Sequence, residues 1–200
     1  MTQLITQANP QGKGVVGVVS DLQQHLSTNV SAKNCSQILT DYFTSSIVLI
    51  AQFSFKPVVG VDYYLYFNND KWLLSLIEPE AWATVPGIFF AHCMLNDDRT
   101  WSLHTISDWQ NSDALVSEIE RLQNDFIASM CNDESFIDQL PYYQSNLKYF
   151  QRLGAYALAH SLKCSLLNQY GHSSCTNLSA KQLLLTGLSG NKYLIENKSQ

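Results

Sequence analysis

The fold is decided by residues 56–101, which read KPVVGVDYYLYFNNDKWLLSLIEPEAWATVPGIFFAHCMLNDDRTW. The first part of this stretch holds two runs rich in tyrosine, valine, leucine and isoleucine, 61–67 and 71–77, on either side of the polar residues 68–70. Asn-Asn-Asp between two such runs is typical of a tight turn. The pattern therefore predicts a β-hairpin.

The second part of the stretch predicts another hairpin. Pro79 has no N–H to donate and excludes a central strand at its position, so residues 79–82 are expected to form a helical turn. Residues 88–95 and 100–106 are again apolar and aromatic, and they flank the turn residues 96–99. Consecutive strands joined by short turns predict an antiparallel β-meander of about four to five strands over residues 61–106.

A helix is expected before this sheet. From Ser31 onward, apolar residues recur at intervals of three and four positions, which places them on one stripe of a helix with Ser31 as its N-cap. Cys35 falls on that stripe and is interpreted as a small buried residue. The helix has to end before Pro57, because proline disfavours helical geometry in the residue before it.

Two helices are expected after the sheet, in the C-terminal part 112–170. The first starts near Ser112, and the second follows Pro141 and ends near Gly171. The predicted fold class is therefore α+β: an antiparallel meander packed with one preceding and two following helices.

The chain is expected to be organised as a lead-in and one domain. Residues 1–30 are polar and predict a flexible or short-helical lead-in, and residues 31–200 predict a single α+β domain that is large enough to bury a core without disulfides. Residues 182–196 fit either a small hairpin or a helix end, and the sequence does not choose between them.

Composition excludes several classes of partner. The chain is 46% hydrophobic and 14% charged, which is typical of an ordered globular protein. A net charge of −5 without a basic run argues against a nucleic-acid partner. There is no apolar signal at the N-terminus, and the longest apolar run, 47–51, is far shorter than the roughly 20 residues that span a bilayer. Five irregularly spaced cysteines then predict reduced thiols, a cytoplasmic location and no membrane association.

The central stretch also resembles a known family. The pattern consists of Lys56-Pro57, Tyr64-Leu65-Tyr66, Ser75-x-Ile77-x-Pro79-x-x-Trp82 and Thr100-Trp101. It resembles an uncharacterised domain-of-unknown-function family with bacterial members and an unassigned human open-reading-frame protein. The family usually has glycine after the Pro-x-x-Trp tryptophan, where this chain has Ala83. The resemblance implies no activity, substrate or cofactor.

One metal site can be drawn from the sequence. His160 and Cys164 are four residues apart on a predicted helix and point the same way, and His172 and Cys175 can return from the following loop. Two nitrogen and two sulfur ligands suit tetrahedral zinc. The competing interpretation is that Cys164 belongs to the helix core, that His172 lies on the surface, and that the protein has no cofactor.

A second candidate pair is His92 and His104. If residues 95 and 101 pair, the two histidines lie opposite each other on one face; if residues 95 and 100 pair, they lie on opposite faces. Cys93 is adjacent, so a Cys–His nucleophile is one hypothesis, and a buried cysteine beside an exposed histidine is the other.

The aromatic residues favour a binding role. Alternation places Tyr64 and Tyr66 on one face of their strand, where they need a cover: the helices, a second subunit or a ligand. Residues expected to contact a ligand or partner are Tyr64, Tyr66, Trp82, Trp101, His92 and His104. The preferred function is a non-catalytic protein- or ligand-binding or adaptor domain with self-association. The alternative is a hydrolase-type enzyme, either metal-assisted or dependent on a Cys/His pair.

Overall fold

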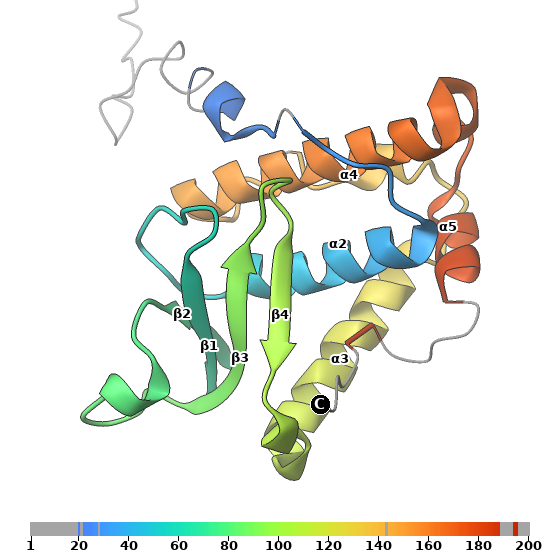
Figure 1. Cartoon of the computed structure of the whole chain (residues 1–200). Helices are drawn as coiled ribbons and strands as arrows, with labels where there is room; N and C mark the ends of the chain where they lie inside the picture. The colour runs from blue at the N-terminus through green and yellow to red at the C-terminus, as the bar shows by residue number, and fades with distance from the viewer. Residues whose placement is uncertain (1–19, 21, 28, 143, 189–193, 196–200) are drawn as a thin grey trace, which may run out of the picture.

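The computed structural model of the 200-residue chain describes residues 20, 22–27, 29–142, 144–188 and 194–195 (Figure 1). Most of the lead-in expected for residues 1–30 therefore lies outside the described residues. The regular elements are α2 (Cys35–Ile50), β1 (Asp62–Asn68), β2 (Lys71–Ser75), the 3-10 turn η1 (Pro79–Ala81), β3 (Ile88–Leu95), β4 (Trp101–Thr105), the 3-10 turn η2 (Ser107–Asn111), α3 (Asp113–Met130), the 3-10 turn η3 (Ile137–Gln139), α4 (Tyr149–Thr176) and α5 (Ala180–Gly187).

The α+β class and the four-stranded antiparallel sheet are confirmed. Both predicted hairpins form. In the first, Asn69 and Asp70 adopt positive φ angles of 48° and 59°, as the two central residues of a type I′ turn require. Asparagine and aspartate tolerate this left-handed geometry better than other non-glycine residues do, so the turn follows from local chemistry.

The strand order, β2-β1-β3-β4, differs from that of a simple meander because β3 pairs with β1. The outer edge of β2 is already occupied: the Gln52 N–H donates to the Trp72 carbonyl, and the Leu74 N–H donates to the Gln52 carbonyl. Residues 76–87 carry the chain back to the other edge of β1. Gly87 permits the close approach there, since a Cβ at this position would lie 2.5 Å from the Phe67 carbonyl oxygen.

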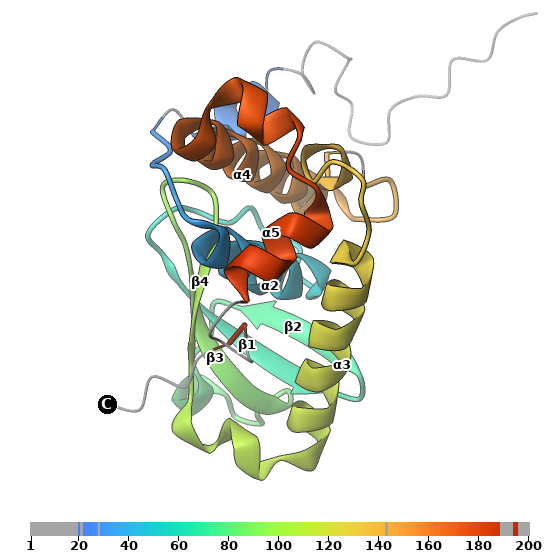
Figure 2. The ribbon, with the colours of Figure 1, turned by 90° about the vertical axis from the view of Figure 1, so that its right-hand side faces the viewer.

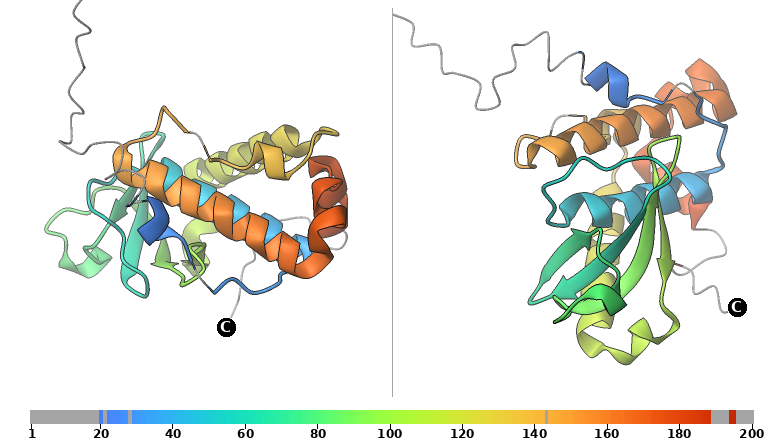
Figure 3. Two further views of the ribbon diagram at one scale, coloured as in Figure 1. Left: turned by 90° about the horizontal axis from the view of Figure 1, so that it is seen from above. Right: turned by 60° about the vertical axis from the view of Figure 1, so that its left-hand side comes forward.

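The helices gather on one side of the sheet. Figure 2 shows α2 and α3 on the same face, and the side chains that alternate toward that face form the core: Tyr63, Leu65, Phe67, Trp72, Leu74, Ala91, Cys93 and Trp101. Seen from above, α4 runs over α2 (Figure 3), and α5 packs against the first turns of α2. The opposite face of the sheet has no α-helix over it within the described part of the chain.

Some of the helix ends lie where capping residues in the sequence predict them, and one does not. Ser112 caps α3 as predicted, accepting a hydrogen bond from the Leu115 N–H. The cap of α2 was expected at Ser31 but is Asn34, which forms a reciprocal capping box with Gln37. Gly171, with φ of 75°, interrupts α4 near the expected end of the third helix.

The tail is helical where it is described. Of the two interpretations of residues 182–196, the helix applies to 182–187, because these residues belong to α5. Residues 189–193 and 196 lie outside the described part.

Replacing Gly187 by Ala is expected to lower the free energy of unfolding by about 1–3 kcal/mol, a cost typical of overpacking. A Cβ there would meet Leu39 Cδ1 at 2.5 Å and the Cys35 carbonyl oxygen at 2.9 Å, and the backbone of α2 cannot rotate away. Gly154→Ala is the matched control. Its Cβ would meet one atom, Cδ2 at the end of the Leu49 side chain, at 2.9 Å, and alanine favours the helix by about 1 kcal/mol over glycine. Urea unfolding of both variants tests this, and equal losses would contradict it.

Candidate functional site

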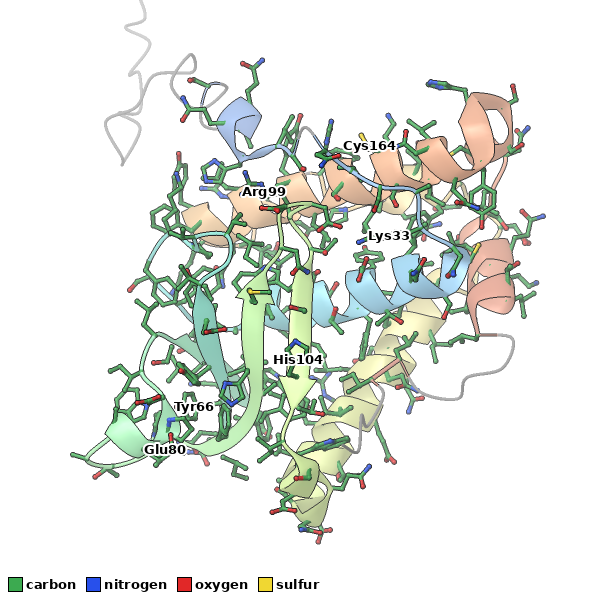
Figure 4. The ribbon with its side chains drawn as sticks, viewed as in Figure 1. Lys33, Tyr66, Glu80, Arg99, His104 and Cys164 are labelled. Carbon is green, nitrogen blue, oxygen red and sulfur yellow. The ribbon has the colours of Figure 1, made fainter. Side chains whose placement is uncertain are left out.

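The uncovered face of the sheet carries a row of polar and aromatic residues across all four strands. Tyr64 on β1 pairs with Ser75 on one side and with His92 on the other, and His92 pairs with His104 on β4. The loop after β3 has the longer of the two predicted forms, since Leu95 pairs with Trp101. The two histidines therefore share a face, and both are exposed; Figure 4 shows His104 on β4. We call this side of the sheet the open face.

An aromatic cluster forms at the centre of the open face. The rings of Tyr64, Phe89 and His92 contact one another, with centroids 5.2 Å apart for Tyr64 and His92 and 5.1 Å apart for Phe89 and His92. Residues three apart in a regular strand point to opposite faces. Here the register shifts at β3 so that Leu65 pairs with Ala91 but Tyr66 pairs with Phe89, which leaves Phe90 as an extra residue. This bulge brings Phe89 and His92 to the same side.

The loop 76–87 covers the part of the open face beside this cluster. The Tyr66 hydroxyl donates to the Ile77 carbonyl oxygen at 2.8 Å, and Trp82 Nε1 donates to the Tyr66 hydroxyl at 3.2 Å. Tyr66 is consequently fully buried and Trp82 half-buried. Both therefore fix the loop, and Tyr66 has no surface with which to contact a partner.

The position after Trp82 does not need glycine. Among the described residues, the positive φ angles outside glycine are those of Asn69, Asp70 and Arg99, so Ala83 has ordinary backbone geometry. The departure from the family pattern at Ala83 is therefore tolerated.

The loop 76–87 and the start of β3 carry several exposed apolar side chains. Of the nine large hydrophobic residues that are exposed in the described part of the chain, four belong to the loop and the start of β3: Leu76, Ile77, Val85 and Ile88. Single exposed apolar residues are ordinary on a protein surface, whereas several in one segment mark a surface that contacts something else.

Three carboxylates lie near Tyr64. Asp62 is two residues before Tyr64 on β1 and shares its face, Glu78 follows the end of β2, and Glu80 lies in η1 beside Tyr66 (Figure 4). Partial burial and the charges of these three carboxylates raise the pKa of the Tyr64 hydroxyl above its usual value. This part of the open face is therefore both aromatic and negatively charged.

Trp101, which was expected to contact a ligand or partner, lies away from this site. Its side chain is 3% exposed, on the face covered by α2, where it packs edge-on against Tyr63 with ring centroids 5.5 Å apart. It belongs to the core. Tyr64, His92 and His104 are the predicted residues that the structure places together on accessible surface.

The four residues of the zinc hypothesis are not brought together. Cys164 Sγ lies 3.7 Å from both ring nitrogens of His160 on α4, as the helical spacing requires. Beyond Gly171, however, the chain turns, and Cys175 is fully buried while His172 is exposed. Among the residues that the structure describes, no three or more His, Cys, Asp or Glu side chains are grouped to hold a metal.

Cys93 is not placed for nucleophilic chemistry. It is 1% exposed on the core face, and burial raises the pKa of its thiol strongly, so the reactive thiolate is suppressed. His92 points to the other face. Of the two interpretations of this pair, the buried cysteine beside an exposed histidine is the one that the geometry supports.

The sequence did not identify Phe89 as part of the site. Alternation from His92 assigns it to the core face, and the bulge that overrides this assignment has no glycine or other local signal at residues 89–91.

Comparison of the chain with protein-family models, with curated proteins and with solved structures gives no match. The family resemblance of residues 56–101 therefore stays a prediction. Within the described residues, no helix is both long and apolar enough to span a bilayer.

Proposed function

We propose that the protein is a non-catalytic binding domain that holds a segment of a partner protein against its open face. The observation that carries this proposal is the partly exposed cluster of Tyr64, Phe89 and His92, on the sheet face that no described α-helix covers. Aromatic side chains flanked by apolar ones are enriched at protein interfaces, because they bury a large area at a low entropic cost.

Two further observations support this role. The residues considered for hydrolase chemistry, Cys93 and the His160/Cys164 pair, are not brought together with the groups they would need. The loop 76–87 is held by Tyr66 and Trp82, so one border of the open face is fixed before binding, which reduces the entropy lost on association. We also propose a cytoplasmic location, which the five free cysteines support.

The test is a selection of random phage-displayed peptides on the full chain, followed by affinity measurement on two variants. Tyr64→Ala/His92→Ala removes the centre of the cluster; Leu185→Ala is the control, because Leu185 is an exposed apolar residue on α5. We expect the selected peptides to bind the wild type and the control alike and the double variant about tenfold or more weakly.

Near-ultraviolet circular dichroism of each variant shows whether it is folded. If no peptides are selected, or if those selected bind the folded double variant as well as the wild type, the open face is not the binding site and the proposal fails.

A further inference from the structure

We propose that the segment bound by the open face is cationic, with a Lys or Arg side chain that lies over Tyr64 between Asp62 and Glu78. This inference rests on the proposed function and names the chemical class of the partner. It follows from the position of three carboxylates beside a partly exposed aromatic cluster.

The backbone brings these groups together. Asp62 and Tyr64 are alternate residues of β1 and point to the same face. Tyr64 pairs with Ser75, the last residue of β2, and the Ile77 N–H donates to the Ser75 hydroxyl, so the chain turns back toward Tyr64 before it reaches Glu78. The Tyr66 hydroxyl donates to the Ile77 carbonyl oxygen at 2.8 Å, which holds the next residue, Glu78, beside the open face.

The carboxylates have no cationic partner within the described part of the chain. The ion pairs there join Lys33 to Asp41 and Asp98, and Arg121 to Glu118 and Asp125, and none of them includes Asp62, Glu78 or Glu80. The strands contain one Lys or Arg residue, Lys71, which lies at the opposite end of β2, paired with Asn68. Within the described residues, no lysine or arginine therefore forms an ion pair with the carboxylates around Tyr64.

A cation from a partner satisfies both features of this surface. The face of a tyrosine ring attracts ammonium and guanidinium groups, and neighbouring carboxylates add charge-assisted hydrogen bonds. The aliphatic stem of Lys or Arg can cover the apolar residues of the loop, such as Ile77, at the same time. An anionic segment would be repelled.

A second copy of this chain is a poorer occupant of the open face. A two-fold interface applies the same surface patch from both subunits, so the acidic group of one copy would approach that of the other. The chain as a whole carries a net charge of −5, which also disfavours self-association. Charge complementarity therefore favours a basic partner.

The probe for this inference is the set of peptides selected on the open face in the phage experiment. We expect them to be enriched in Arg and Lys, and we expect replacement of the conserved Arg by its neutral isostere citrulline, or of Lys by norleucine, to weaken binding about tenfold. Glu78→Gln should weaken the Arg peptide and leave the citrulline peptide unchanged. Glu120→Gln, at an exposed position on α3, is the matched control and should change neither.

Each outcome has a separate meaning. The selected peptides could bind through Tyr64 and His92 and yet be neutral, or bind equally well as citrulline analogues. Either result overturns this inference and leaves the proposed function standing. Dimerisation of the chain that is lost in Tyr64→Ala/His92→Ala identifies a second copy as the occupant and overturns the inference. Failure to select any peptide removes the proposed function itself.

Discussion

Replacing Lys33 by Met is expected to lower the free energy of unfolding by about 2–4 kcal/mol, since removal of one partner from a buried ion pair leaves charges uncompensated. Lys33 Nζ donates to Asp41 on α2 and to Asp98 in the turn between β3 and β4, both at 2.5 Å. The three side chains are only 15–23% exposed. Without the lysine, two carboxylates of like charge face each other with little access to water.

The pKa shifts of the two aspartates determine how the free energy of unfolding changes with pH. Burial alone would raise the pKa of Asp98, but hydrogen bonds from Lys33 and Thr100 lower it below its usual value. In the wild type, Asp98 therefore adds stability above the pKa of an unfolded aspartate, about 3.9, and this stability is lost as the pH falls through its lower folded pKa. Burial raises the pKa of Asp41 above its usual value, so the ionisation of Asp41 lowers the stability, whereas that of Asp98 raises it.

In Lys33→Met both carboxylates lose the group that favours their charged form, so both folded pKa values are expected to rise. The deficit relative to the wild type should then be largest near neutral pH and should shrink as the pH falls and the carboxylates are protonated. Urea unfolding at neutral pH and near pH 4 measures this difference. Asp98→Asn in the Lys33→Met background should recover part of the loss; a deficit that does not change with pH would refute the electrostatic explanation.

Replacing Trp101 by Ala is expected to lower the free energy of unfolding by about 3–5 kcal/mol, the usual cost of removing a large buried aromatic side chain. Its indole is 3% exposed and packs against Tyr63, which itself stacks on Phe55 with ring centroids 5.4 Å apart. The backbone bonds of Trp101, from its N–H to Ser45 and from Thr44 to its carbonyl, survive the substitution. The loss is therefore one of packing.

Tyr64→Ala is the comparison that separates core from surface. Its ring is only partly covered, so we expect a loss of about 1 kcal/mol or less, as for most surface substitutions. Chemical denaturation of the two variants measures the difference. A larger loss for Tyr64→Ala than for Trp101→Ala would mean that the open face is structural and that the assignment of the two faces is mistaken.

Several elements could be predicted because their causes are local. Asn69 and Asp70 tolerate the left-handed geometry of a two-residue hairpin turn, Ser112 offers a hydroxyl to the first turn of α3, and Gly171 accepts a positive φ. Each of these signals acts through one or two residues in contact along the chain. The α+β class follows from the same level of information, because the hydrophobic period changes from two to about three and a half at residue 112.

The site depended on contacts between distant segments. The pairing of His92 with His104 depends on the turn between β3 and β4. In this turn Arg99 has a φ of 68°, and Asp98 accepts a hydrogen bond from Lys33, which lies 65 residues earlier in the chain. The pairing of β3 with β1 follows from the occupation of the β2 edge by Gln52. The bulge at Phe90 then determines which aromatic rings reach the open face.

The sequence by itself therefore determined the elements of this protein, their turns and the aromatic character of its sheet, since propensity, capping and alternation act over a few residues. Only the tertiary structure decided which aromatic residues are core and which are accessible. A strand has two faces, and the choice between them depends on which face α2 and α3 cover. For that reason Trp101 became part of the core, Tyr66 came to support a loop, and Tyr64 was left on the surface with Phe89 and His92.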